Sequence, residues 1–239
     1  MNEAVVEIDN VSKIFDGKIH ALNNINLKIN RNDFLVIAGS NGSGKSVLMT
    51  LIAGLDNPSK GKISTSGKVG LVFQDADSQI LGETPLDDVL FGIKNCGVPK
   101  KDQVPLAENV LERVGLLHKK NDCAAALSGG EKRRLAVAGI LAMNRDIILF
   151  DEPFANLDWP GVKSVCSILS DLKSRGVTVV VLTHETEKIL GLANRFVILD
   201  KGEIRFDGTV GEGLSLDLEK WSIRNPMVEY KKIGDLLWL

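Results

Sequence analysis

The stretch FLVIAGSNGSGKS, residues 34–46, decides the fold class of this chain. Its first five residues are all apolar, which is typical of a strand buried on both faces of a parallel sheet. The remaining GSNGSGKS (39–46) is a glycine-rich loop of the kind that holds phosphates, and residues 47–55 after it carry helical apolar spacing. A strand, this loop and a helix in that order predict a nucleotide-triphosphate site in an α/β fold.

The chemistry of this loop follows from its residue types. Gly42 and Gly44 let backbone N–H groups turn inward around phosphate oxygens. The helix that starts near Lys45 adds the positive end of its dipole, the Lys45 ammonium can reach the β- and γ-phosphates, and the Ser46 hydroxyl suits Mg²⁺. A glycine turn that binds nothing is the alternative, and the full pattern between a strand and a helix counts against it. The residues predicted to contact the nucleotide are Ser40, Asn41, Gly42, Ser43, Gly44, Lys45, Ser46 and Val47.

Further predicted strands and helices alternate along the chain. Apolar runs at 147–150, 177–182 and 196–199 predict buried strands, with helices near 162–172 and 186–192 between them. This alternation predicts an α/β sheet with crossover helices. The other predicted elements are strands at 5–8, 25–29, 62–65 and 69–73, helices at 86–93, 106–116 and 129–143, and a hairpin at 200–206.

Two acidic residues, Asp151 and Glu152, follow the apolar run at 147–150. Ligands of parallel sheets bind at the carboxyl ends of the strands, so Asp151 is predicted to hold Mg²⁺ or its water. A solvated acid pair after a strand is the alternative interpretation. The phosphate-binding loop upstream favours the metal role.

The segment LSGGE, residues 127–131, lies between the loop and the acid pair. With these flanks the chain resembles the ATP-binding-cassette (ABC) ATPases. The resemblance implies an α/β P-loop NTPase of ABC ATPase type, with a mixed core sheet, an N-terminal antiparallel β-subdomain and a helical subdomain. It implies an ABC ATPase domain at 1–213, with the helical, signature-bearing subdomain inserted at about 75–143, and a short C-terminal tail at 214–239. The cofactors that it implies are ATP and Mg²⁺.

The same resemblance assigns roles around the phosphates, in addition to that of Lys45. Glu152 matches the residue that polarises the attacking water, and His184, which follows an apolar strand, matches the histidine that contacts the γ-phosphate and this water. Gln74 matches a glutamine that ligates Mg²⁺ and water. Phe15 matches the aromatic residue that stacks on adenine, although a core phenylalanine is an equally good interpretation. A lone histidine after a strand is more often structural, and its place in the ordered set favours function.

The LSGGE segment also implies a partner. In the ABC family two ATPase chains pair head to tail, and the signature of one contacts ATP held by the other. By this resemblance Asp158, in the segment Asn156-Leu157-Asp158, crosses the interface, although the family often has glycine at the first of these positions. The alternative for LSGGE is a capped helix start. The residues expected to contact the partner's ATP are Ser128, Gly129, Gly130 and Glu131.

Three further segments narrow the resemblance. VFQDADSQI (72–80), DDVLFG (87–92) and SGGEKRR (128–134) look like the energy-coupling-factor (ECF) group and its cobalt-type ATPases. Those importers pair two ATPases with a transmembrane coupling protein and a substrate-binding membrane protein, and they move vitamins or transition-metal ions. We expect Asp87 or Asp88 to contact the coupling protein, the alternative being that these acids complement a helix dipole.

The bulk composition excludes few classes. The 239 residues carry a net charge of −2, which gives no electrostatic reason to expect nucleic acid as a partner. No apolar run approaches the roughly 20 residues that span a bilayer, and the N-terminus lacks signal-peptide features. We therefore expect a peripheral subunit on the cytoplasmic face of the cell membrane. The alternatives are a soluble ABC ATPase, an ATPase of another ABC transporter class, a regulatory subunit with a silent site, and a P-loop kinase.

Overall fold

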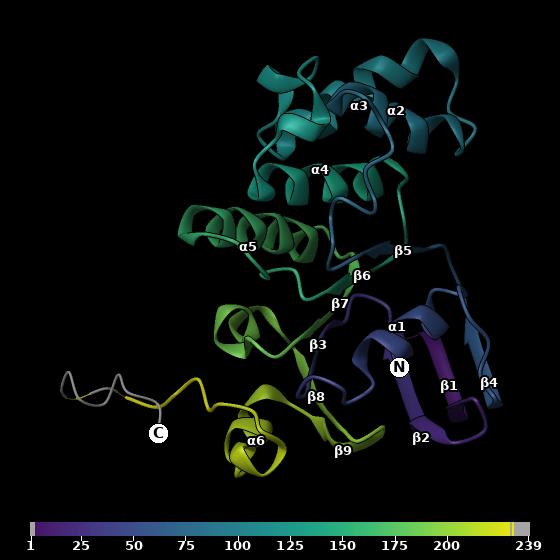
Figure 1. Cartoon of the computed structure of the whole chain (residues 1–239), viewed down its shortest axis with the longest axis vertical. Helices are drawn as coiled ribbons and strands as arrows, with labels where there is room; N and C mark the ends of the chain where they lie inside the picture. Colours follow the sequence, from purple (N-terminus) through teal and green to yellow (C-terminus); the bar gives the residue numbers. More distant parts are fainter. Residues whose placement is uncertain (1–2, 230, 232–239) are drawn as a thin grey trace.

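The computed structural model describes residues 3–229 and 231. Figure 1 shows helices α2, α3 and α4 at one end, a large sheet in the middle, and a smaller sheet beside α1 at the other end. This is the α/β arrangement of an ABC ATPase that the resemblance implies, with its mixed sheet, antiparallel sheet and helical part. Residues 230 and 232–239 of the predicted tail lie outside the described part of the chain.

The large sheet is mixed and has six strands in the order β5-β6-β7-β3-β8-β9. Its first five members are parallel to one another, and β9 pairs antiparallel with β8. Every residue of β3, β6 and β7 is buried, as their continuous apolar runs predict. The strands are β3 (Phe34–Ala38), β5 (Val69–Val72), β6 (Ile147–Asp151), β7 (Thr178–Thr183), β8 (Arg195–Asp200) and β9 (Glu203–Gly208).

The smaller sheet is antiparallel, in the order β2-β1-β4. Its strands are β1 (Ala4–Phe15), β2 (Ile19–Asn30) and β4 (Lys60–Thr65), longer than their predicted ranges. The apolar alternation breaks where β1 changes register between Ile8 and Val11. Asn10 and Asn24 adopt positive φ angles of 48° and 50° there, a conformation that asparagine tolerates well. These irregularities hid the full strand lengths from a search for strict alternation.

The helical part consists of α2 (Pro85–Lys94), α3 (Lys100–Arg113) and α4 (Gly129–Ala142). Thr84 caps α2 by accepting a hydrogen bond from Asp87 N, and Pro85 follows at the first helical position. Helix α3 begins and ends earlier than the predicted helix 106–116. Its first turns are polar, so the apolar spacing did not reveal them. Gly92 brings α2 close to α4, since a Cβ there would lie 3.0 Å from Met143 Cγ.

The remaining helices pack on the large sheet. They are α1 (Lys45–Ile52), α5 (Trp159–Ser174) and α6 (Val210–Leu214), with single 3₁₀ turns at η1 (Leu117–Lys119), η2 (Ala124–Ala126), η3 (Thr186–Lys188), η4 (Leu190–Leu192) and η5 (Leu218–Trp221). The predicted helix 186–192 is wrong: the chain forms η3 and η4, and Ile189 between them has the non-helical φ of −138°. After α6, Leu218 and Ile223 are 1% and 2% exposed and join the main core.

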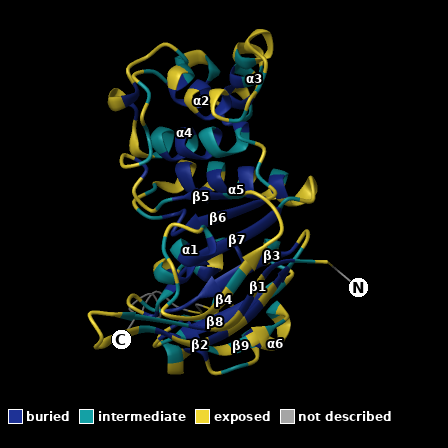
Figure 2. Ribbon diagram, turned by 90° about the vertical axis from the view of Figure 1, so that its right-hand side faces the viewer, coloured by how far each residue is buried: buried dark blue, intermediate teal, exposed yellow. Residues whose placement is uncertain are grey.

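Two cores cover the two faces of the large sheet. Along β3 the side chains alternate between them, with Phe34 and Val36 in one and Leu35 and Ile37 in the other. The first core joins the sheet to α5 and the helical part, and the second joins it to α1 and the antiparallel sheet. Figure 2 shows β5, β6 and β7 as buried strands in the middle of the molecule. This packing places the carboxyl ends of β3, β6 and β7 at one edge.

Candidate functional site

The loop after β3 has the backbone conformation that its glycines permit. Gly42 and Gly44 have φ angles of +79° and +104°. A Cβ on Gly44 would lie only 2.7 Å from the Ala21 carbonyl oxygen and 2.8 Å from Leu22 Cδ2. The conformation and the close approach both require glycine here. Helix α1 begins directly afterwards, at Lys45, so its N-terminal dipole faces the loop.

Lys45 is held at the centre of this loop. Its side chain is 6% exposed, and its ammonium donates hydrogen bonds to the carbonyl oxygens of Gly39 (2.7 Å) and Ser40 (3.1 Å). The same nitrogen lies 3.5 Å from Glu152 Oε1. A buried cation beside inward-facing N–H groups is suited to phosphate oxygens.

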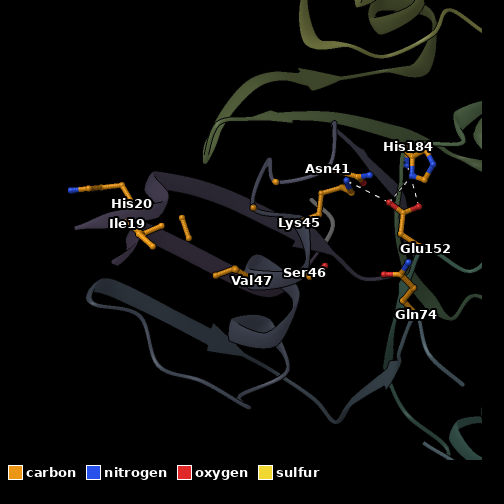
Figure 3. Close-up of a pocket in the computed structure, with 12 residues that line it drawn as sticks. Ile19, His20, Asn41, Lys45, Ser46, Val47, Gln74, Glu152 and His184 are labelled. Carbon is orange, nitrogen blue, oxygen red and sulfur yellow. Dashed lines mark hydrogen bonds and ion pairs between the residues drawn. The ribbon is translucent and has the colours of Figure 1, made fainter. Parts of the chain in front are cut away.

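Glu152 lies where two neighbouring strands end. Strands β6 and β7 run parallel, with Asp151 opposite Leu182, so Glu152 meets the residues that follow β7. Its Oε2 accepts hydrogen bonds from Thr183 Oγ1 (3.0 Å) and from His184 N (3.3 Å). Its Oε1 lies 3.0 Å from His184 Nδ1. Figure 3 shows Glu152 between Lys45 and His184. This set places a carboxylate, an imidazole and an ammonium at the phosphate loop.

The backbone of Glu152 is itself unusual. Its φ is +42°, and the residue is 5% exposed. Non-glycine residues rarely adopt this conformation, and strain of this kind gathers at functional sites. Here the turn directs the carboxylate toward the loop, while Glu152 N donates a hydrogen bond to the Leu182 carbonyl oxygen at 2.8 Å.

Asp151 and Ser46 offer ligands for a metal ion. Burial raises the pKa of Asp151, and a hydrogen bond from Ser46 acts against this rise. Asp151 Oδ1 is buried and has no hydrogen-bond partner among the described residues. This carboxylate oxygen lacks a hydrogen-bond donor and lies beside a serine hydroxyl. Such a pair fits Mg²⁺, which prefers oxygen ligands and is commonly bound by protein oxygens together with substrate phosphates. Within the described residues there is no group of three or more His, Cys, Asp or Glu side chains that could hold a metal alone.

These residues surround one cavity of about 340 Å³. Nine of the residues predicted for the nucleotide and for catalysis line the cavity, together with three that sequence reasoning missed, Ile19, His20 and Ala21 from β2. The predicted strand at 25–29 was too short to include these three, whereas β2 begins at Ile19. Ser40, Ser43 and Asp151 were also predicted for this site and do not line the cavity. The lining residues are Ile19, His20, Ala21, Asn41, Gly42, Gly44, Lys45, Ser46, Val47, Gln74, Glu152 and His184.

Phe15 lies next to this cavity rather than in its lining. It ends β1, pairs with Ile19 across the strands, and is 38% exposed. The Lys13 ammonium lies 5.0 Å from the centre of its ring and also contacts Asp56 at 2.7 Å. Its predicted stacking on adenine stays a prediction, and Ile19 is the apolar side chain that the cavity itself presents at this end.

The LSGGE segment forms the start of α4, away from the cavity. Ser128 caps the helix, with its Oγ accepting from Glu131 N (3.3 Å), and Glu131 Oε2 accepts from Ser128 N (2.9 Å). These two hydrogen bonds form a capping box, so LSGGE does form the capped helix start that was its alternative interpretation. A Cβ added to Gly129 would meet no atom within 4 Å, and one added to Gly130 would make only ordinary contacts at 3.9 Å or more. In Figures 1 and 2 α4 lies beyond α5, on the far side from α1.

Helix α4 is tied to the segment that carries Gln74. Arg133 is 4% exposed, and its guanidinium donates to the carbonyl oxygens of Phe73 and Gln74. Lys132 forms an ion pair with Asp77 at 2.6 Å. Burial lowers the pKa of Arg133, while the acids Asp75 and Asp151 act in the opposite direction. Sequence reasoning missed this link, whose only signal was the basic run after the signature.

Asp158 caps α5, accepting a hydrogen bond from Gly161 N at 2.9 Å. Asn156, which stands where glycine is common, has a φ of +59° and so keeps the left-handed turn. Trp159 follows and is 72% exposed.

Asp87 and Asp88, in the first turn of α2, have different surroundings. Asp88 is 9% exposed, and its Oδ1 accepts from Leu81 N (2.8 Å) and Gly82 N (3.0 Å), while burial raises its pKa. Its carboxylate therefore closes the preceding loop, and its predicted contact with a coupling protein stays a prediction. Asp87 is exposed and accepts from Thr84 Oγ1 at 2.6 Å.

The sequence of this chain resembles those of known proteins. The family model described as "ABC transporter" matches residues 22–155, more than half of the chain. The chain belongs to the ABC transporter family. The ABC chain is 36% identical to the energy-coupling factor transporter ATP-binding protein EcfA1 of Fusobacterium nucleatum, over 85% of this chain and 82% of the relative. It is 37% identical to EcfA2 of Thermotoga maritima, with the same two coverages of 85% and 82%.

Solved structures agree with this assignment. The ABC chain is similar to cbiO1 of Clostridium perfringens, described as part of the ABC transporter complex cbiONQ, with a TM-score of 0.81, 28% identity, and coverage of 94% of this chain and 96% of that one. It is also similar to the cassette MJ0796 in a dimeric post-hydrolysis state with ADP and Pi, with a TM-score of 0.78, 30% identity, and coverage of 86% and 98%. The chain is thus an ABC ATPase of the energy-coupling-factor type.

Proposed function

We propose that this chain hydrolyses ATP to drive an ECF-type importer for a vitamin or a transition-metal ion. One observation carries the proposal. The signature at the start of α4 is open and does not line the chain's own cavity, whereas the phosphate loop, Glu152 and His184 are assembled there. Such a division is expected if the signature serves ATP held by another ATPase chain, the same or a related one.

In this proposal the phosphate loop and Lys45 hold the triphosphate. Glu152 Oε1 orients the attacking water, and His184, 3.0 Å from it, holds the carboxylate and faces the γ-phosphate. Lys45 and the N-terminus of α1 neutralise charge that develops on the phosphoryl oxygens. Thr183 and His184 N fix the other oxygen of Glu152, so its orientation is set before the nucleotide arrives.

Mg²⁺ would be held by Ser46 and Asp151, with Gln74 at the rim of the cavity. When bound, it would supply positive charge that offsets the negative charge of the phosphates. The donorless Oδ1 of Asp151 supports this assignment.

The proposal also places the chain in an assembly. Among the described residues, no helix combines the length and the apolarity needed to cross a bilayer. We propose that the chain attaches to the cytoplasmic face of the membrane through a transmembrane coupling protein and its substrate-binding subunit. Exposed Asp87, rather than buried Asp88, is the acid available for that contact.

The mass of the Glu152→Gln variant in solution tests the proposed pairing. Glutamine keeps an oxygen for Thr183 and His184 N, so the fold should persist while hydrolysis slows ~100-fold or more. With Mg-ATP we expect a shift to twice the monomer mass, reversed by washing out ATP. Glu219→Gln, remote from the cavity, is the control. A Glu152→Gln chain that hydrolyses ATP at the normal rate contradicts the assigned role, and a monomer at saturating Mg-ATP contradicts pairing of two copies.

A further inference from the structure

A carboxylate sits inside the signature, where the proposed ligand is an anion. Glu131 is the third residue of α4, and its Oε2 accepts from Ser128 N at 2.9 Å and from Ser128 Oγ at 3.0 Å. The N–H groups of Gly129 and Gly130 begin the same turn, and the first N–H groups of a helix have no partner within it. A phosphate approaching them would meet the negative charge of Glu131 within one turn.

The ammonium of Lys119 balances the negative charge of Glu131. Lys119, in η1, forms an ion pair with the free oxygen of Glu131, Oε1, at 2.7 Å. The two side chains are 33% and 16% exposed, so the pair is only partly solvated. Together with the capping hydrogen bonds, this ion pair lowers the pKa of Glu131 to about 2. Glu131 is therefore charged at neutral pH and electrically balanced by Lys119.

We propose that Lys119 is a positioning residue of the signature: it neutralises Glu131 so that α4 can receive the γ-phosphate of ATP bound to a second chain. Lys119 does not need to touch that phosphate. Its ammonium holds the Glu131 carboxylate in the capping box. It also offsets the repulsion between this carboxylate and a phosphate at the N-terminus of α4. This inference rests on the proposed function.

The first test measures ATP-driven pairing in the Glu152→Gln background. Four chains are compared by sedimentation across Mg-ATP concentrations: the background itself, and the same chain with Lys119→Met, with Glu131→Gln, and with both. We expect Lys119→Met to weaken pairing ~10-fold, because an unbalanced carboxylate then faces the phosphate. Glu131→Gln should weaken pairing less than Lys119→Met does, since glutamine preserves the capping box and carries no charge for Lys119 to balance. The double variant should recover to the level of Glu131→Gln.

This pattern separates charge balance from simple structural support. If the ion pair only fastens η1 to α4, then Lys119→Met, Glu131→Gln and the double variant all lose it and should be equally impaired, which would overturn the inference. Lys119→Arg should behave as the background. Lys120→Met is the matched control, because Lys120 pairs with Glu108 at 2.6 Å and not with the signature.

A second measurement locates the effect. Binding of a fluorescent ATP analogue to dilute, monomeric chain reports the chain's own phosphate loop, and it should be unchanged by Lys119→Met. The pairing defect should also shrink as salt is raised, because screening weakens the repulsion. A background chain that fails to pair would contradict the proposed pairing of two copies, and the inference for this pairing would fall with it. A background that pairs normally and ignores Lys119→Met would overturn the inference alone.

Discussion

At the scale of single residues, a buried hydroxyl helps to orient Glu152. Thr183 is 0% exposed and donates to Glu152 Oε2 at 3.0 Å. We predict that Thr183→Val lowers kcat about tenfold with little change in KM, because the carboxylate loses one of its donors while the phosphate loop is intact. Steady-state ATPase kinetics measure this. Thr183→Ser keeps the hydroxyl and should be close to normal; equal kcat values for valine and threonine would show that the hydroxyl does not position Glu152.

At the scale of elements, the cap of α4 makes stability depend on acid pH. The pKa of Glu131 is lowered to about 2 from an ordinary value of 4.5, first by the hydrogen bond to Lys119 and then by Ser128 N. The unfolded chain binds a proton at this group before the folded chain does, so the contribution is full above pH 4.5 and is lost as the pH falls toward 2. Solvent screening limits the contribution to about 1–2 kcal/mol.

We therefore predict that Glu131→Gln loses less stability than the parent chain between about pH 5 and pH 3, as urea unfolding measured across that range would show. Glu108→Gln is the matched control, since Glu108 pairs with Lys120 but caps no helix. Parallel stability curves for Glu131→Gln and the parent would contradict the depressed pKa.

At the scale of the whole molecule, Arg133 joins the helical part to the strand layer. It reaches from α4 to the carbonyl oxygens of Phe73 and Gln74, which follow β5 and lead into the cavity. We predict that Arg133→Met destabilises the fold by about 2–3 kcal/mol, because two partly buried hydrogen bonds from a charged donor are lost, and that it raises KM for ATP by loosening Gln74. Urea unfolding and ATPase kinetics measure both effects. Arg134→Met, at a half-buried neighbouring position, should change stability far less; equal losses in the two variants would remove this role from Arg133.

The sequence by itself determined the features that lie within short stretches. The phosphate loop at 39–46, the buried strands and the LSGGE cap were all predictable, because strand periodicity, glycine turns and helix capping depend on neighbouring residues. So was the place of Asp151 and Glu152 at a strand end. These local signals, taken in order along the chain, were enough for the ABC resemblance.

Only the tertiary structure decided which distant groups meet. The contacts of Glu152 with Thr183, of Arg133 with Phe73, and of Lys119 with Glu131 depend on how strands and helices pack, not on any local pattern. The same packing buried Asp88 against the loop before α2 and set Phe15 beside the cavity. Burial and approach between segments far apart in the chain leave no periodic trace in the sequence, which is why these roles emerged only from the folded molecule.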